Sequence, residues 1–420
     1  MNKKVFYFVL LIISLGFFSA CSNDDDEVAP TPNYATEIAG TYKGNMNVKI
    51  PALEFEQNSQ REIILKESAE QGKLRLELRD FSFPITGETE TPVGDIVVDN
   101  VPVSKDGSSY TLSETTADIT ILQGSIKAKA TVSGTVKNNE VNLKIAVIAD
   151  VVGTVNVTFG GNKDIYDFEE WIVENPDSED ETKFFYAPAG GWSTSNTGAF
   201  LLQAITDPES GVPYADKMLV TQSTKEDAHS GNKAARIETI DTKGKDLVFV
   251  KIPKVTTGTL FLGKFQVTNF QETLTSTKFG IPYNKKPLAV KGYYKYKPGE
   301  VYYSSSVESS NIAVAESNTT DECSINGILY EITSEKDEYL TGVDAYNSPK
   351  LVARAELKDG TAKTEYIAFN LNFEFKYGKT YDPNKKYRLS IIFSSSKDGD
   401  KFSGAPGSVM FVDDVEIVSE

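Results

Sequence analysis

The feature that most constrains this chain is the recurrence of short segments in which apolar and polar residues alternate, divided by Gly, Asn, Asp and Pro. No segment keeps a helical period over more than a few turns. Successive side chains of a β-strand point to opposite faces, so the pattern indicates strands with one buried face, as in sandwiches and barrels. With 420 residues, the chain is long enough for two or three domains. We therefore predict an all-β protein.

The composition excludes several functional classes. The 60 Asp and Glu residues outnumber the 43 Lys and Arg residues and give a formal net charge of −17, so the phosphates of a nucleic acid would be repelled. One His and two Cys exclude multi-histidine metal centres, Cys-x-x-Cys clusters and a disulfide framework. No glycine cluster carries the Lys-Ser/Thr pair of a phosphate-binding loop.

The N-terminal segment has the layout of an export signal. Two lysines precede an apolar run at residues 5–20, which is short for a transmembrane helix and suits the core of a signal peptide. The run ends in Phe18-Ser19-Ala20 before Cys21. This resembles the lipobox of bacterial lipoproteins, although Phe18 stands where Leu is usual. The resemblance implies that residues 1–20 are a signal peptide and that Cys21 is lipidated, so that acyl chains alone hold the protein to the membrane. The alternative is ordinary secretion with an incidental Cys21.

Residues 21–35 combine four consecutive acids with prolines, which favours an extended tether. The acidic run resembles the lipoprotein-export signal of Bacteroidetes, which implies attachment to the outer membrane facing the cell exterior. A solvated linker on a periplasm-facing lipoprotein is the alternative. The remaining thiol, Cys323, has no His or basic cluster beside it, so we expect it to be buried and inert.

The block at 36–160 predicts a closed up-and-down barrel of about eight strands. Its opening Gly-Thr-Tyr-Lys-Gly at 40–44 resembles the first strand of a calycin, with Tyr42 where an aromatic residue closes the barrel base. The block resembles the calycin-like domain of Bacteroidetes lipoproteins. A calycin cavity could hold a small apolar ligand, and the alternative is a filled barrel that serves as a spacer. A polar break at 160–164 ends the block. The expected strands cover residues 41–50, 61–66, 73–81, 94–103, 109–112, 121–134, 141–149 and 153–159.

The block at 165–420 contains both tryptophans and most of the tyrosines. Its motifs are Phe-Glu-Glu-Trp at 168–171, Trp-Ser-Thr-Ser-Asn at 192–196, His-Ser-Gly-Asn at 229–232 and Val-Asp-Asp-Val-Glu-Ile at 412–417. This order is similar to jelly-roll carbohydrate-binding modules, and more closely to the putative carbohydrate-metabolism domain of Bacteroidetes lipoproteins. The resemblance implies a jelly-roll β-sandwich that binds glycan, with other surface glycan-utilisation proteins as partners.

Sugar C–H groups suit the electron-rich face of an aromatic ring, so exposed rings are candidate ligand-binding residues. We expect Trp192 to be exposed because small and polar residues surround it. Tyr293 shares a strand face with two lysines, whereas Tyr294 and Tyr296 are expected in the core. Trp171 is a weaker candidate, because its apolar neighbours favour core packing. Asn196 and Arg236 are candidate polar partners because they lie near these motifs.

One metal site is expected. If the last strand alternates regularly, Asp413 shares a face with Phe411, Val415 and Ile417, where an unpaired carboxylate would be costly. Jelly-roll modules often hold structural Ca²⁺ between the glutamate of a Phe-Glu motif and an aspartate of the last strand. The resemblance implies that Glu169 and Asp413 bind Ca²⁺, with carbonyl oxygens near residues 232 and 233. The alternative is that Asp413 reaches water.

Catalysis has little support in the sequence. His229 is the one histidine, and it precedes Ser-Gly in what reads as a surface turn with no orienting partner in sight. No catalytic residue is therefore assigned. The main interpretation is a non-catalytic surface lipoprotein that captures glycan. The alternatives are a structural or adhesin-like protein-binding lipoprotein and a glycoside-active enzyme.

Overall fold

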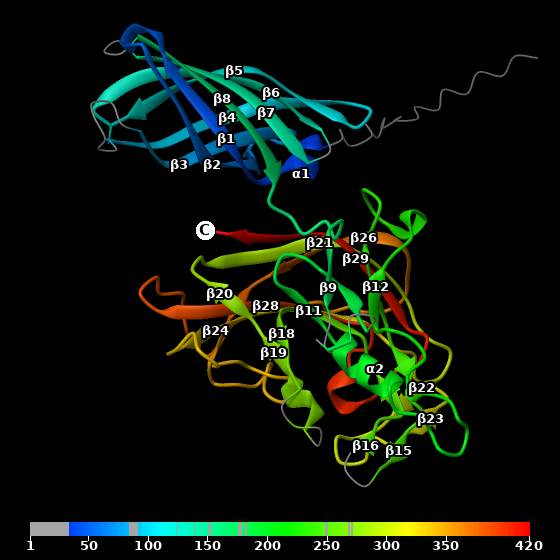
Figure 1. Cartoon of the computed structure of the whole chain (residues 1–420). Helices are drawn as coiled ribbons and strands as arrows, with labels where there is room; N and C mark the ends of the chain where they lie inside the picture. Colours follow the sequence, from blue (N-terminus) through cyan, green and yellow to red (C-terminus); the bar gives the residue numbers. More distant parts are fainter. Residues whose placement is uncertain are drawn as a thin grey trace, which may run out of the picture.

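The computed structural model describes residues 33–83, 91–122, 124–137, 139–149, 153–174, 179–180, 183–247, 251–267, 269 and 272–420. It is all-β, as predicted, with an N-terminal barrel and a larger second domain (Figure 1). Cys21 and the acidic tether lie outside the described residues. Within the described ranges, no helix is both long enough and apolar enough to cross a membrane.

The first domain is a closed barrel in which each strand pairs with the next and β8 returns to β1. The last barrel strand ends a few residues later than predicted, because residues 160–163 continue β8 and pair with β1. Glycine is needed there because the two strands approach closely: a Cβ on Gly161 would lie 2.7 Å from the carbonyl oxygen of Lys43. The eight strands are β1 (Gly40–Ile50), β2 (Phe55–Glu67), β3 (Lys73–Phe83), β4 (Thr91–Asp106), β5 (Ser109–Ile121), β6 (Ile126–Lys137), β7 (Glu140–Ala149) and β8 (Gly153–Lys163).

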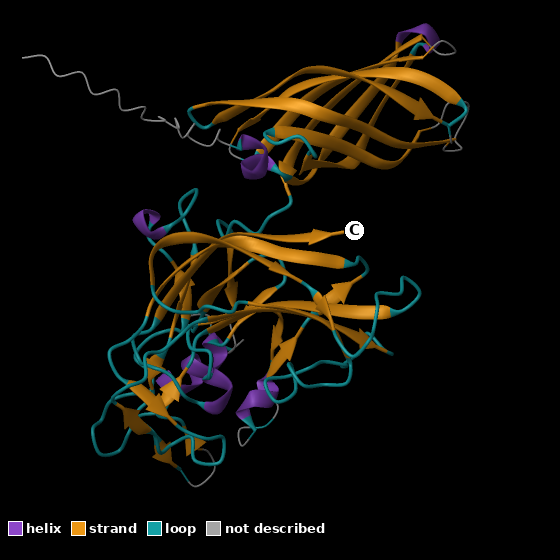
Figure 2. Cartoon of the chain, turned by 180° about the vertical axis from the view of Figure 1, so that it is seen from behind, coloured by secondary structure: helices purple, strands orange, loops and turns teal. Residues whose placement is uncertain are grey.

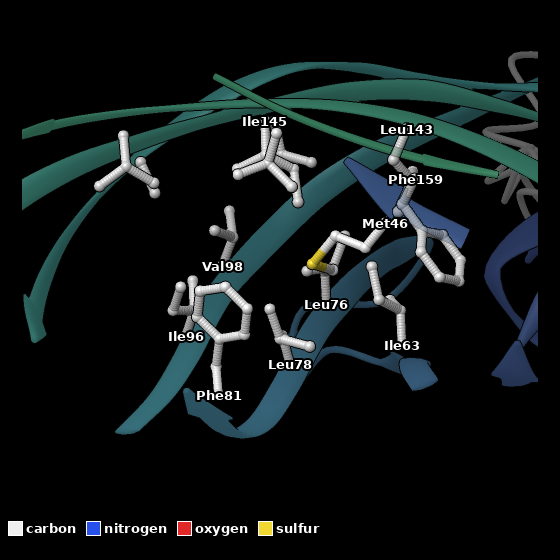
Figure 3. Packing of buried hydrophobic residues seen from close by; sticks show 14 of the residues in the cluster. Met46, Ile63, Leu76, Leu78, Phe81, Ile96, Val98, Leu143, Ile145 and Phe159 are labelled. Carbon is white, nitrogen blue, oxygen red and sulfur yellow. The ribbon is translucent and has the colours of Figure 1, made fainter. Parts of the chain in front are cut away.

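Alternating apolar side chains point into the barrel and form one continuous cluster. Met46, Leu76 and Phe159 lie among them (Figure 3). The short helix α1 (Tyr34–Ile38) lies at one end, where Tyr42 is fully buried and its hydroxyl donates a hydrogen bond to the Ile38 carbonyl at 2.8 Å. This packing favours the filled-barrel alternative over a ligand cavity.

The second domain packs two antiparallel sheets against each other (Figure 2). Tyr294 and Tyr296 lie in the core between them, as expected, and Cys323 is also buried there, where burial raises the pKa of its thiol. The larger sheet contains β11 (Trp192–Thr194), β18 (Thr259–Phe265), β28 (Lys386–Ser394), β24 (Ser324–Ile332), β25 (Leu351–Glu356) and β27 (Glu374–Phe375), with β19 (Thr277–Phe279) and β20 (Ile281–Tyr283) attached. The smaller sheet contains β12 (Val220–Gln222), β13 (Ala235–Glu238), β29 (Val409–Ser419), β21 (Pro287–Lys297) and β26 (Lys363–Asn372).

The outer face of the larger sheet is covered as well. Phe261, Ile328 and Ile392 point away from the inter-sheet core and form a separate apolar cluster. Helix α2 (Asn196–Gln203) follows β11. Four two-stranded sheets complete the fold, namely β9 (Trp171–Glu174) with β10 (Phe185–Pro188), β14 (Ile240–Asp241) with β17 (Val255–Thr256), β15 (Lys245–Asp246) with β16 (Lys251–Ile252), and β22 (Tyr302–Ser304) with β23 (Val314–Glu316).

The two domains are joined by a short connection and by ion pairs. Directly after β8, Tyr166 exchanges backbone hydrogen bonds with Val415 of β29, at 2.7 and 2.9 Å. Lys163 Nζ lies 3.7 Å from a carboxylate oxygen of Glu416, and both side chains are largely buried. The chain therefore passes directly from β8, the last strand of the barrel, to the edge of β29 in the smaller sheet of the second domain.

Candidate functional site

Several of the predicted residues meet at the loop formed by residues 229–233. Glu169 Oε1 accepts hydrogen bonds from the backbone N–H groups of residues 232 and 233, at 2.5 and 2.9 Å. Asp413 Oδ2 accepts hydrogen bonds from the N–H groups of residues 229 and 230, at 3.0 and 3.2 Å. Gly231 lies between these contacts, and a Cβ there would lie 2.2 Å from Glu169 Oε1. The two carboxylates thus hold one loop from its two ends.

The last strand does not alternate regularly, which corrects the predicted face of Asp413. Tyr293 pairs with Asp413, whereas Lys291 pairs with Glu416, so β29 contains an extra residue at this point. Asp414 takes up the irregularity with a positive φ of 50°. Asp413 therefore lies on the outer face of its sheet beside Tyr293, although it is still fully buried. Burial, followed by the nearby charge of Asp414, raises the pKa of Asp413 to about 7 against the opposing effect of the N–H donors.

His229 has an orienting partner that the sequence did not reveal. Its Nδ1 lies 2.8 Å from Asp414 Oδ2, and its ring stacks on Tyr293 with 3.7 Å between centroids. The Ser230 hydroxyl donates to the other oxygen of Asp414 at 3.0 Å, so serine and histidine share one carboxylate and do not form a nucleophile–base pair. His229 covers one face of Tyr293, which corrects the expectation of an open stacking surface.

The residues at this loop do not fit the expected calcium site as they are placed. Ca²⁺ takes oxygen ligands, but N–H donors face Glu169 Oε1 and Asp413 Oδ2. Ca²⁺ bound to Glu169 and Asp413 would have to displace these hydrogen bonds.

We expect the melting temperature to be the same with EDTA as with added Ca²⁺, because backbone N–H groups already satisfy both carboxylates. Calorimetry of the whole chain, together with elemental analysis, measures this. A lower melting temperature in EDTA that Ca²⁺ restores would contradict the expectation and would show that the loop rearranges around a cation.

Two of the candidate ligand-binding residues, Trp192 and Asn196, are in the core. Trp192 is only 4% exposed and contacts the rings of Tyr166, Phe168 and Phe393. Asn196 is fully buried, and its side-chain amide bonds the backbone of residues 219 and 220 through three hydrogen bonds of 2.7–3.0 Å. The predicted exposure of Trp192 is wrong, and the Asn196 amide is already bonded within the protein, because these side chains connect β11 and α2 to neighbouring strands.

The two remaining candidates also have intramolecular partners. Trp171 is partly buried against the inter-sheet core, and its Nε1 donates to the Phe168 carbonyl at 2.7 Å. Arg236 lies opposite Phe411 on the outer face of the smaller sheet and forms an ion pair with Glu238 at 2.7 Å. The structure therefore brings Tyr293, Glu169 and Asp413 around one loop and places Trp192 and Asn196 elsewhere.

A cavity of about 240 Å³ lies on the opposite side of the sandwich, over the outer face of the larger sheet. Helix α2 forms part of its wall, and apolar and aromatic side chains make up most of its lining. A hollow that combines apolar surface with polar groups is the usual form of a small-molecule site. Its aromatic lining residues are Phe265, Phe279, Tyr346 and Phe402.

Several polar groups of the cavity lie where β18 begins, and Thr273, Ser276 and Thr277 line it near the other end of that strand. Thr259 pairs with Ser394, which in turn pairs with Ser324, and all three line the cavity. Thr257 lies beside them, and its buried Oγ1 has no hydrogen-bond partner among the described residues. Gly399 permits this close packing, since a Cβ there would lie 2.8 Å from Thr257.

The sequence could not reveal this cavity. Its lining residues come from segments between positions 195 and 402, and none belongs to the motifs at 168–171, 229–232 or 412–417. The one local signal is Ser195, which begins α2 and lines the cavity, but its hydroxyl accepts a backbone N–H from Thr259. Long-range strand pairing creates the space.

Comparisons with known proteins agree with this architecture. Residues 38–162 match the calycin-like β-barrel domain, and residues 167–418 match the putative carbohydrate metabolism domain. One solved structure, a putative glycoside hydrolase from Bacteroides thetaiotaomicron, is 25% identical, with a TM-score of 0.49 over 70% of this chain and 86% of that one. Another, from Bacteroides vulgatus, is 27% identical, with a TM-score of 0.47 over 61% and 98%. No curated protein matches the chain. The chain belongs to the family defined by the putative carbohydrate metabolism domain, which fills most of its length after a calycin-like barrel.

Proposed function

We propose that this chain is a non-catalytic protein that binds carbohydrate in the cavity of its second domain. The observation that carries the proposal is the cavity itself, which combines aromatic side chains with hydroxyl groups. Aromatic rings suit the C–H faces of a sugar, and the partly exposed hydroxyl residues Thr259, Ser324 and Ser394 offer hydrogen-bond partners for its hydroxyl groups. Membership of a carbohydrate-metabolism family supports sugar as the ligand class.

The charges at the cavity support binding rather than hydrolysis. Glycoside hydrolysis usually needs a pair of carboxyl groups on either side of the scissile bond. Among the described lining residues, Asp400 supplies the one carboxylate. His229, Asp413 and Asp414 lie together beside the smaller sheet, on the side of the sandwich away from the cavity. Their carboxyl groups therefore cannot act as the second acid of a hydrolase in the cavity. We therefore propose that the domain holds glycan without cleaving it.

Replacing Gly198 tests the cavity directly, because this residue lines it from α2. A Cβ at this position meets only the Phe265 ring, at 3.9 Å, so Gly198→Ala should fit and leave the space open. Gly198→Phe places a ring in the cavity. We expect Gly198→Phe to weaken glycan binding at least about tenfold, equivalent to about 1.4 kcal/mol, while Gly198→Ala stays within about twofold. A glycan array followed by calorimetric titration of the best ligand measures this.

Thermal melting shows whether both variants are folded. Equal binding by Gly198→Phe and Gly198→Ala would show that the cavity is not the glycan site. An array without any bound glycan would favour the adhesin-like, protein-binding alternative. Release of sugar from labelled polysaccharide by the natural chain would instead support a glycoside-active enzyme.

We further propose that lipid on Cys21 anchors the protein to the outer membrane, facing the exterior. Replacing Cys21 with Ala should move the protein from the membrane fraction to the soluble fraction, because a lipid would be its sole attachment. Immunoblots of the two fractions measure the shift, and protease treatment of intact cells shows which side is exposed. Membrane association that persists in Cys21→Ala would contradict the lipid anchor.

A further inference from the structure

The cavity has two chemically different ends, which follow the direction of β18. Its seven residues span roughly 20 Å at the usual rise per residue. Thr259 at the start of the strand pairs with Ser394. Phe265 at the other end pairs with Thr277, and Leu274 lines the cavity nearby. Thr273, Ser276 and Thr277 also line this second end, and the Thr277 hydroxyl already donates to the Leu274 carbonyl and accepts from the Gly342 N–H. Hydroxyl groups therefore occur at both ends, and the second end adds more large apolar side chains.

The polar end offers partners for a sugar. Thr259, Ser324 and Ser394 line it, and all three residues are partly exposed. Lys251, Lys397 and Asp400 stand at the mouth, with exposed side chains. Tyr346 is fixed beside them by Arg354, whose guanidinium carbon lies 4.5 Å from the ring centroid. A saccharide hydroxyl that enters here can replace the hydrogen bonds that it gives up to water.

The second end offers a sugar fewer partners, because large apolar side chains stand beside its hydroxyl groups and the Thr277 hydroxyl is already bonded within the protein. Leu201, Leu202 and Ile205 from the α2 segment face Phe265 and Val267 across this part of the cavity. A sugar hydroxyl placed between these side chains would lose its hydrogen bonds to water without compensation. An alkyl, acyl or aryl group would instead bury apolar surface against them.

We propose that the cavity takes a saccharide that carries an apolar substituent, such as an alkyl, acyl or aryl glycoside. The sugar lies at the Thr259 end, and the substituent lies between α2 and Leu274. This inference rests on the proposed function, because it assumes that the cavity holds sugar. It specifies which class of sugar the cavity prefers.

Matched glycosides test the proposal in the whole chain. Methyl and octyl β-glucoside, β-galactoside and β-mannoside are titrated by calorimetry, with the octyl compounds kept below their micelle concentration and with 1-octanol as a reference. At least one octyl glycoside should bind ten or more times as tightly as its methyl counterpart and as 1-octanol, as expected when a few methylene groups are buried.

Two variants locate the two parts of the ligand. Leu274→Ser should reduce the preference for the octyl over the methyl glycoside at least threefold, whereas Val343→Ser, at an exposed position outside the cavity, should preserve it. Ser324→Ala should weaken both glycosides by a similar factor, because Ser324 lines the polar end and is partly exposed. Thermal melting confirms that each variant is folded.

The outcomes separate this inference from the proposed function. Methyl and octyl glycosides that bind equally would overturn the inference and leave carbohydrate binding intact. Octyl glycosides that bind no better than 1-octanol would show that sugar is not recognised, so both would fail. A preference for octyl that Leu274→Ser leaves unchanged would place the substituent elsewhere and would also overturn the inference.

Discussion

Replacing Trp192 with Ala should lower the free energy of unfolding of the second domain by about 3–5 kcal/mol, the range found for buried aromatic residues. The ring is 4% exposed, and its centroid lies 5.1–5.7 Å from those of Tyr166, Phe168 and Phe393. Truncation would open a space between the two sheets that these neighbours cannot fill without moving. Urea denaturation followed by circular dichroism measures the change.

Two controls make the result specific. Tyr377 is 66% exposed, so Tyr377→Ala should change the free energy of unfolding by less than about 0.5 kcal/mol. Trp192→Phe keeps an aromatic ring and removes an indole N–H that is buried without a partner among the described residues, so it should cost much less than Ala. An unchanged stability of Trp192→Ala would mean that the ring does not support the core.

Asp413 should make the stability of the protein depend on pH in the opposite sense to most acids. Its pKa is about 7 in the folded chain and near 3.8 when unfolded, so the folded state holds a proton that the unfolded state releases. Stability from this group is fully present below about pH 4 and is lost as pH rises to about 7. The difference in pKa corresponds to about 4 kcal/mol.

The contribution of Asp413 is isolated by comparison with Asp413→Asn, which cannot ionise. Free energies of unfolding of both proteins are measured from pH 4 to pH 8 in EDTA. The natural chain should lose roughly 4 kcal/mol more than the variant over this range, because other groups contribute equally to both. Parallel pH profiles would show that Asp413 is already ionised at low pH and that its surroundings stabilise the charge.

The barrel was predictable from sequence because its strands follow the rules that sequence patterns express. Each strand buries one face, so apolar residues recur at every second position from Tyr42 to Phe159. Consecutive strands pair with each other, so no long-range information is needed to order them. The main miss was β5 (Ser109–Ile121), whose middle residues are polar and give a weak pattern even though all lie in the strand.

The candidate site was less predictable because polar residues were taken as signs of exposure. The hydroxyls of Ser193 and Ser195 accept backbone N–H groups of β18 at 3.0 Å, and Asn196 bonds the chain around Val220. These bonds satisfy the polar groups inside the protein, so a polar segment beside Trp192 can be buried. The sequence also did not indicate the extra residue of β29 at Asp414, because residues 411–417 are equally compatible with a strand that alternates regularly. Pairing with β21 reveals it.

The contact between Lys163 and Glu416 also bears on where the chain can be divided. The matches to the two family domains end at residue 162 and begin again at residue 167, which invites a cut between them. A fragment that starts after Lys163 would keep the Glu416 carboxylate, which is 8% exposed in the whole chain, without its cation. It would also lose the barrel surface that covers this end of β29. We therefore expect a fragment cut between the two family matches to be less stable than the same domain in the whole chain.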